Sequence, residues 1–292
     1  MEKNINLQTL TIAFIGSGTI AEAMIGALLS QALTKPTNIL ASGPRSERGN
    51  ELQATYGIVP FTDNSSAASD ADIIVLSTKP QKLNSVLHSL RGSIKPSSFI
   101  ISIVAGASIQ KITSGLDHKS IIRAMPNTPA RIGEGITVWT ASEYISTKQL
   151  DQTRSLLSAL GEEIFLKEEA YLDMATALSG TGPSYVYLFM EALIDAGVHL
   201  GFPRRIAEQL VLKTIQGSLD FYSKSDLHPS ALRNAVTSPG GTSAEAIYFL
   251  EKAGFRTAIS RAIWAAYERT LELGSDQPSN PSQKEINIDS FQ

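Results

Sequence analysis

The sequence of 292 residues contains no cysteine, which excludes disulfide bonds, thiolate metal sites and cysteine nucleophiles. Its four histidines are scattered, and no cluster of Asp, Glu or His has the spacing of metal ligands. No apolar run reaches the roughly 18 residues that a membrane-spanning helix needs. We therefore expect neither a metal site nor a membrane span.

Strong charge and targeting signals are also absent. The formal net charge is −3, and no cluster of Lys and Arg provides the footprint of a nucleic-acid-binding protein. The start, Met1-Glu2-Lys3-Asn4, lacks the basic and apolar regions of a secretory signal. With 42% apolar and 18% charged residues, the chain is long enough for two packed domains. These features predict a soluble cytoplasmic protein that binds neither nucleic acid nor membranes.

A glycine-rich turn follows the first apolar run of the chain. The run at residues 11–14 leads into Gly16-Ser17-Gly18-Thr19-Ile20-Ala21, after which apolar residues recur at helical spacing. In dinucleotide-binding proteins the first glycine permits a tight turn, the second lets the backbone meet the pyrophosphate, and the small third residue lets helix and strand pack. The order of strand, turn and helix predicts a dinucleotide site.

The end of the second predicted strand indicates which dinucleotide binds. An NAD site places Asp or Glu there to accept hydrogen bonds from the ribose 2′-hydroxyl, whereas a 2′-phosphate needs a cation. Here the strand ends in Ser42-Gly43-Pro44-Arg45-Ser46, and Glu47 is expected on the following helix. The sequence favours NADPH, with Arg45 at the 2′-phosphate, while NADH stays possible. The alternative is that Arg45 is a solvated residue at a helix start.

The first half of the chain alternates strand-like and helical stretches, as in a parallel sheet covered on both faces. Strands are expected at residues 11–15, 38–41, 73–77, 99–103, 121–124, 135–139 and 163–166. Beyond residue 168 only helices are expected. We predict a doubly wound, Rossmann-type α/β domain at residues 1–166, an all-α domain at 167–274 and a polar, disordered tail at 275–292.

The predicted helices at residues 185–200 and 255–273 carry apolar residues on several faces. Helices of this kind need burial on more than one side. One small helical domain offers too little partner surface, so the pattern favours a homodimer. The alternative is a compact monomeric bundle.

Hydroxyls and glycines gather before two helices of the second half, at Ser179-Gly180-Thr181-Gly182-Pro183-Ser184 and at Ser238-Pro239-Gly240-Gly241-Thr242-Ser243. Free backbone N–H groups and the positive end of the helix dipole converge at such places. They can hold a substrate carboxylate without an arginine. The alternative is that the glycines and prolines only turn the chain.

Two further loops follow predicted strands. Ser77-Thr78-Lys79-Pro80 leaves the third strand, and Met125-Pro126-Asn127-Thr128-Pro129 leaves the fifth. Ligands of parallel sheets bind beyond the carboxyl ends of the strands. Both loops are therefore predicted to line a nicotinamide pocket, with the Asn127 side chain available for hydrogen bonds.

In combination, these motifs resemble the pyrroline-5-carboxylate reductase family, whose members make proline from its cyclic imine. The likeness runs from Leu10 to Leu273 and is strongest at residues 179–185, 201–205, 236–243 and 250–256. It implies a nucleotide-binding domain followed by a helical domain that interlocks into a dimer, and such dimers often assemble further.

The resemblance and the motifs together assign the site residues. The predicted NADPH site comprises Ile15, Gly16, Ser17, Gly18, Thr19, Ile20, Ala21, Ser42, Arg45, Ser46, Asn64, Ser77, Thr78, Lys79, Pro80, Val104, Ala105, Gly106 and Asn127. The predicted substrate site comprises Asp226, Ser238, Gly240, Gly241, Thr242 and Ser243. The sequence departs from the family at Ser243, usually threonine, at Thr181, often serine, and at Ala235, which is polar in some relatives.

The chemistry of the predicted substrate loops favours an imine substrate. Reduction of a ketone leaves an alkoxide and calls for an acid such as Lys, His or Tyr, whereas a protonated imine becomes a neutral amine. The loops offer hydroxyls and amides but no His or Lys. Ser243 is accordingly predicted to be the catalytic hydroxyl that hydrogen-bonds the ring nitrogen, with orientation supplying most of the rate.

Two alternatives stay open. One is an NADPH-dependent dehydrogenase of the hydroxyacid or ketopantoate type, which requires a catalytic lysine, and Lys213 is the available candidate. The other is a protein that binds a dinucleotide without turnover, because a fold alone does not establish a function.

Overall fold

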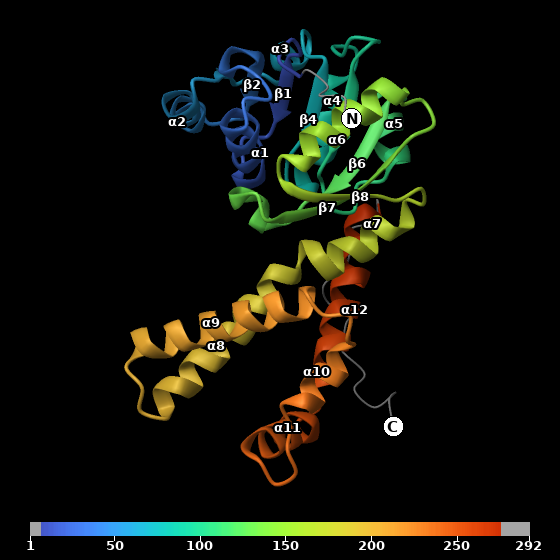
Figure 1. Cartoon of the computed structure of the whole chain (residues 1–292). Coiled ribbons are helices and arrows are strands. Elements are labelled where there is room, and N and C mark those ends of the chain that lie inside the picture. The colour runs from blue at the N-terminus through green and yellow to red at the C-terminus, as the bar shows by residue number, and fades with distance from the viewer. Residues whose placement is uncertain (1–6, 276–292) are drawn as a thin grey trace. The chain divides into compact units, whose positions relative to one another are not determined.

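A computed structural model of the chain describes residues 7–275 (Figure 1). Within these residues the first part of the chain builds one eight-stranded sheet, with the strand order β3-β2-β1-β4-β5-β6-β7-β8. The strands are β1 (Ile12–Ile15), β2 (Ile39–Ser42), β3 (Val59–Phe61), β4 (Ile73–Leu76), β5 (Phe99–Ser102), β6 (Ile121–Met125), β7 (Gly135–Ala141) and β8 (Gly161–Phe165). Only the β6–β7 pair is antiparallel.

Helices cover both faces of this sheet, which gives it two apolar cores (Figure 1). Side chains alternate along each strand, so Ile12 and Phe14 of β1 enter one core while Ala13 and Ile15 enter the other. The first core is closed by α1 (Thr19–Ser30), α2 (Ser46–Tyr56) and α6 (Thr147–Ser158). The second is closed by α3 (Asn64–Ala68), α4 (Leu83–Leu90) and α5 (Ile109–Leu116).

All seven predicted strands are present, with ends that differ by up to two residues. The strand β3 was not predicted, because Val59-Pro60-Phe61 is very short and contains a proline. Proline is tolerated here because β3 lies at the edge of the sheet, where a strand pairs on one side only. Short helices η1 (Pro36–Asn38), η2 (Pro80–Lys82) and η3 (Thr128–Ile132) complete the connections.

The chain divides into two compact units, a sheet unit that includes residues 7–180 and 266–275, and a helical unit at residues 181–265. This division falls later than the predicted boundary at residue 166, because α7 (Ala170–Ala175) packs on β6 and β7. Arg123 on β6, only 4% exposed, meets Glu169 at 3.0 Å and Asp173 at 2.5 Å. These ion pairs hold α7 and the following π-helical turn η4 (Thr176–Gly180) in the sheet unit.

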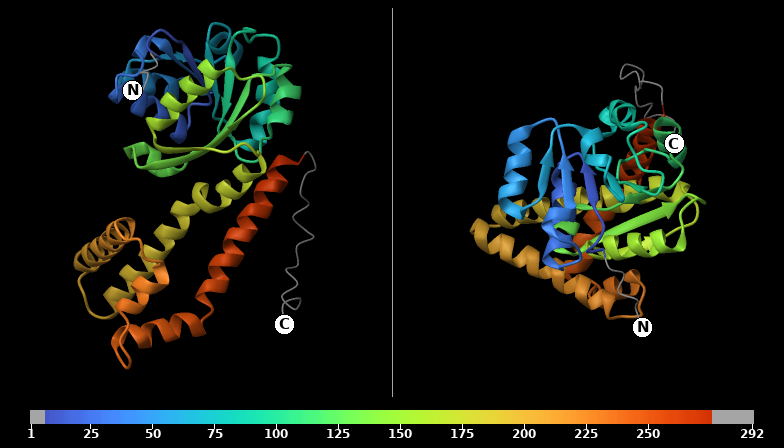
Figure 2. Two further views of the ribbon diagram at one scale, coloured as in Figure 1. Left: turned by 45° about the vertical axis from the view of Figure 1, so that its right-hand side comes forward. Right: turned by 90° about the horizontal axis from the view of Figure 1, so that it is seen from above.

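The helical unit leaves much of its apolar surface uncovered. It contains α8 (Gly182–His199), α9 (Arg204–Ser223), α10 (Pro229–Ala235), α11 (Thr242–Lys252) and the first half of α12 (Phe255–Gly274), whose second half belongs to the sheet unit. The helices α8 and α9 run side by side (Figure 2). Leu188, Leu219 and Phe221 are nevertheless 63–67% exposed.

Two expected absences concern membranes and metals. Among residues 7–275, no helix is long and apolar enough to cross a membrane. The same residues bring together no group of three or more His, Cys, Asp or Glu side chains that is arranged to hold a metal ion.

Candidate active site

The sheet has a topological switch point between β1 and β4. After β1 the chain builds β2 and β3 on one side, and it then returns to place β4 on the other side of β1. The loops that leave β1 and β4 therefore diverge. Ligands of such sheets bind in the crevice that opens there, beyond the carboxyl ends of the strands.

A cleft of about 480 Å³ lies at this switch point. It is lined by Gly16, Ser17, Gly18, Ser42, Gly43, Pro44, Arg45, Thr62, Asn64, Ser77, Thr78, Lys79, Lys82, Ser85 and Val86. The structure thus brings together nine of the predicted cofactor residues from four separate segments of the chain. Gly43 and Pro44 lie within the motif at the end of β2 but were not assigned to the site. Thr62, Lys82, Ser85 and Val86 were missed, because they follow the unpredicted strand β3 or lie around the start of α4, where no motif marks them.

Glycine is required at position 16, because the loop that follows β4 approaches the backbone there closely. The φ of Gly16 is +107°, and a Cβ atom here would lie 2.6 Å from the carbonyl oxygen of Ser77. The Ser77 hydroxyl donates to the Gly16 carbonyl at 2.7 Å and closes the same contact. Gly43 is similarly confined, because its Cβ would lie 2.5 Å from Ser17 Oγ. Both glycines keep backbone, rather than side chains, at the wall of the cleft.

The polar groups of the cleft fit a dinucleotide. The helix α1 begins at Thr19, directly after the Gly16 turn, and its first N–H groups have no carbonyl partner within the helix. Thr78 Oγ1 is buried and has no hydrogen-bond partner in the described chain. On the β2 side, Ser42 Oγ donates to Asn64 Oδ1 at 2.7 Å. The N–H groups of α1 and the Thr78 hydroxyl are thus available as donors to phosphates and ribose hydroxyls.

A second cavity of about 420 Å³ adjoins this cleft and shares Ser17, Gly18 and Arg45 with it. Thr19 and four charged residues of α1 and α2 complete its lining, namely Glu22, Glu47, Arg48 and Glu51. Arg45 is exposed at the N-cap of α2, and Ser46 is the first residue of that helix. This arrangement places a cation beside the end of β2, as the sequence predicted.

Other predicted cofactor residues lie outside the lining of both cavities. Ile15 and Ala21 are buried in the cores, and Ile20 packs against one of them, so only their backbones can face a ligand. Pro80 begins η2, Val104 is buried, and the neighbouring Ala105 is half-buried. Their contacts with the cofactor stay predictions.

Asn127 and Gly106 both make contacts within the protein that stabilise the fold. The Asn127 Oδ1 atom accepts a hydrogen bond from the Ile136 N–H at 3.0 Å, which leaves the amide nitrogen for a ligand. Gly106 has a φ of +71°, and a Cβ atom there would lie 2.7 Å from the Thr270 carbonyl oxygen in α12. The absence of a side chain at Gly106 is therefore explained by helix packing.

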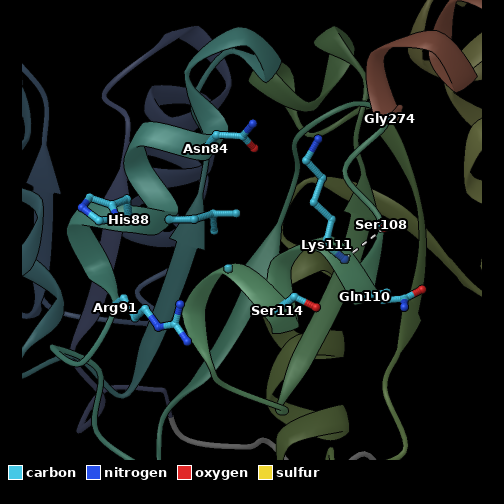
Figure 3. A pocket seen from close by; sticks show the side chains of 10 residues that line it. Asn84, His88, Arg91, Ser108, Gln110, Lys111, Ser114 and Gly274 are labelled. Carbon is cyan, nitrogen blue, oxygen red and sulfur yellow. Dashed lines mark hydrogen bonds between the residues drawn. The ribbon is translucent and has the colours of Figure 1, made fainter. Parts of the chain in front are cut away.

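A larger cavity, of about 680 Å³, lies between α4 and α5 (Figure 3). His88 extends from α4, Arg91 follows the end of that helix, and Lys111 extends from α5. The lining contains no predicted cofactor residue. This groove is distinct from the cleft at the switch point, so its size alone does not make it the active site.

The predicted substrate loop lies in the helical unit, at the N-terminus of α11. Gly240 has a φ of +71°, and the Gly241 N–H donates to the Ser238 carbonyl at 3.0 Å. This turn presents Thr242 and Ser243 in the first turn of α11, where backbone N–H groups lack helical partners. The Ser243 side chain is half-buried. The binding of a substrate carboxylate by this loop stays a prediction.

Two other predicted positions of the helical unit lie on its surface. Asp226 is exposed between α9 and α10, in a shallow cavity that also contains His228. Lys213, the candidate of the dehydrogenase alternative, is exposed on α9 and contacts Gln216 at 3.5 Å.

Two family models match the chain. The model described as pyrroline-5-carboxylate reductase dimerisation matches residues 169–273, close to the predicted helical domain. The model described as NADP oxidoreductase, coenzyme F420-dependent, matches residues 11–106.

Individual relatives extend over nearly the whole chain. A pyrroline-5-carboxylate reductase of Synechocystis is 40% identical over 91% of this chain and 99% of its own length. That of Pseudomonas aeruginosa is 38% identical over 91% and 98%. The crystal structure of the Plasmodium falciparum pyrroline carboxylate reductase with NADP bound is 32% identical, covers 92% of this chain and 99% of its own, and superposes with a TM-score of 0.85.

Proposed function

Because this chain belongs to the pyrroline-5-carboxylate reductase family, we propose how its residues reduce 1-pyrroline-5-carboxylate to L-proline with NADPH. The activity is that of an oxidoreductase that acts on a carbon–nitrogen double bond. The observation that carries it is the cleft at the switch point of a fold that this chain shares, over 92% of its length, with a relative solved with NADP bound.

The sheet unit holds the cofactor. The N–H groups at the start of α1 bind the pyrophosphate, Arg45 binds the 2′-phosphate, and the loops at 77–80, 104–106 and 127 surround the nicotinamide. When bound, NADPH supplies the hydride. Two features support this assignment. A side chain at Gly16 would collide with the Ser77 carbonyl, and the buried Thr78 hydroxyl has no hydrogen-bond partner in the described chain.

The helical unit holds the substrate. The backbone amides between Gly240 and Ser243 bind the carboxylate, and the turn of φ +71° at Gly240 presents them. The Ser243 hydroxyl oxygen accepts a hydrogen bond from the protonated ring nitrogen and so favours that form. The Asp226 carboxylate is proposed to lie near the substrate. Since reduction of a protonated imine yields a neutral amine, these residues bind and orient and need no strong acid.

The test is NADPH oxidation by the purified protein, followed by absorbance, with pyrroline-5-carboxylate or ketopantoate as substrate. We expect oxidation with the cyclic imine alone and proline as the product. Oxidation only with the keto acid would support the dehydrogenase alternative, and Lys213→Ala would then abolish it. Tight NADPH binding without turnover on either substrate would support a non-catalytic protein.

Arg45 is predicted to set the preference for NADPH over NADH. Replacement by Met removes the cation beside the end of β2, so the Kd of NADPH should rise about tenfold while that of NADH stays unchanged. Fluorescence titration of each cofactor measures both values. Arg91→Met, directly after α4 and outside both cavities of the cofactor site, is the control. An equal loss of affinity for both cofactors in Arg45→Met would contradict a 2′-phosphate contact.

The family's dimerisation region and the uncovered apolar side chains support a homodimer. Monomeric proteins rarely expose large contiguous apolar surface. Leu188 on α8 is 67% exposed, and Phe221 on α9 is 66% exposed. We propose that a second copy of the chain covers these helices and that the predicted helical domain, residues 167–274, is the dimerisation domain. The proposed compartment is the cytoplasm.

Leu188→Glu should break this dimer. Burying a carboxylate between two copies costs far more free energy than burying the leucine gains. The variant should therefore elute as a monomer or aggregate. Size-exclusion chromatography with light scattering measures the mass. The matched control is Ile132→Glu in η3 of the sheet unit, where the side chain is 77% exposed. A Leu188→Glu protein that stays dimeric would place the interface elsewhere.

A further inference from the structure

Arg48 joins α2 to the glycine-rich loop of the cofactor cleft. Its Nε donates to the Ser17 carbonyl oxygen at 3.2 Å, and its terminal nitrogens meet Glu22 at 2.5 Å and Glu51 at 3.1 Å. The side chains of Arg48 and Glu22 are only 23% and 26% exposed, so this contact is partly shielded from water. Each guanidinium nitrogen therefore has a partner within the protein, and the group is held in one place.

Glu22 makes this contact important for an anionic ligand. It lies in the first turn of α1, the helix whose N-terminus faces the cleft. A phosphate bound at that N-terminus is attracted by the helix dipole and repelled by a nearby carboxylate. Arg48 offsets the charge of Glu22, and the Tyr56 hydroxyl adds a weaker hydrogen bond at 3.4 Å. The pKa of Arg48 is raised chiefly by its hydrogen bond to Glu22.

The two arginines of this region thus differ in their surroundings. Arg48 is tied to Ser17, Glu22 and Glu51, whereas Arg45 makes no ion pair within the described part of the chain and lies exposed at the start of α2. An exposed arginine is available to a 2′-phosphate. An arginine whose nitrogens are all engaged acts instead through the groups that it holds.

We propose that Arg48 is a positioning residue for the pyrophosphate of the cofactor. It fixes the carbonyl of Ser17, which orients the peptide that leads into Gly18, and it cancels the charge of Glu22. This inference rests on the proposed dinucleotide site. Since the pyrophosphate is common to NADPH and NADH, Arg48 supports both cofactors equally, in contrast to the predicted role of Arg45.

The experiment is a double-mutant cycle on Arg48 and Glu22, read as the Kd values of NADPH and NADH by fluorescence titration. Arg48→Met should raise both Kd values by the same factor, about tenfold. Glu22→Gln alone should change either value by no more than about twofold, because it removes the repulsive charge together with the ion pair. Adding Glu22→Gln to Arg48→Met should restore most of the lost affinity.

Arg154→Met provides the matched control. Arg154 on α6 also pairs with two acids, Asp151 and Glu163, but it lies outside the cleft, so its loss should leave both Kd values unchanged. Thermal unfolding of each variant separates folding from binding. A loss confined to NADPH would make Arg48 a 2′-phosphate ligand, and an equal loss that Glu22→Gln does not restore would exclude the charge mechanism. A wild-type chain that binds neither cofactor would instead contradict the proposed function.

Discussion

Gly16→Ala is expected to weaken NADPH binding by about 100-fold, because a strained backbone conformation and a steric collision coincide at this position. The new Cβ would lie 2.6 Å from the Ser77 carbonyl oxygen, and backbone cannot yield as a flexible side chain can. The turn between β1 and α1 must shift, which moves the N–H groups that face the pyrophosphate. Titration of NADPH fluorescence measures the effect, and circular dichroism checks the fold.

Alanine substitutions at two other glycines distinguish the effect of backbone strain from that of the steric collision. Gly92 has a φ of +81°, and no atom lies within 4 Å of the place that a Cβ would take, so Gly92→Ala carries the conformational cost without a collision and should leave NADPH binding intact. Gly43→Ala meets only the Ser17 hydroxyl, which can rotate, and should give an intermediate loss. Unaltered NADPH binding by Gly16→Ala would show that the loop tolerates a displacement and does not touch the pyrophosphate.

Ser243→Ala is expected to lower kcat by about 100-fold while the Kd of NADPH stays unchanged, because the hydroxyl is proposed to act on the ring nitrogen of the substrate and not on the cofactor. Steady-state kinetics with pyrroline-5-carboxylate gives kcat and KM separately. Ser243→Thr keeps a hydroxyl at the start of α11 and should retain most of the turnover.

Ser218→Ala is the matched control for the loss of a serine hydroxyl. Ser218 is exposed on α9, where its hydroxyl donates to the Thr214 carbonyl of its own helix at 2.7 Å. This variant should keep both kcat and KM. Unchanged turnover in Ser243→Ala would remove Ser243 from the mechanism and leave the backbone amides of the loop as the substrate contact.

Strands buried on both faces were predictable, because a run such as Ile73 to Leu76 is apolar without interruption and is bounded by polar residues. The compact units divide after residue 180, whereas the predicted boundary at residue 166 lies close to the start of the family's dimerisation region at residue 169. The later division depends on Arg123, whose partners Glu169 and Asp173 lie 46 and 50 residues further along the chain. Local sequence patterns do not reveal ion pairs between residues so far apart. The packing of α7 on the sheet unit was therefore not predictable.

The same distinction applies to the cofactor site. The loops after β1, β2 and β4 were predictable, because each follows a strand and the carboxyl ends of parallel strands share one edge. The contacts of Arg48 were not predictable, because two of its partners, Ser17 and Glu22, lie 31 and 26 residues earlier in the chain, outside α2. The predicted role of Gly106 gained a second explanation only when the end of α12 was found packed against it.

The return of α12 to the sheet unit has a consequence for the order of folding. Residues 7–180 leave the ribosome before residues 270–274, which pack against Gly106 and are synthesised after the whole helical unit. Contacts between distant parts of the sequence form late and slow the search for the native state. We therefore expect the sheet unit to complete its structure only after α12 has been translated. A nascent chain interrupted within the helical unit should leave Gly106, in the loop that follows β5, without its contacts to α12.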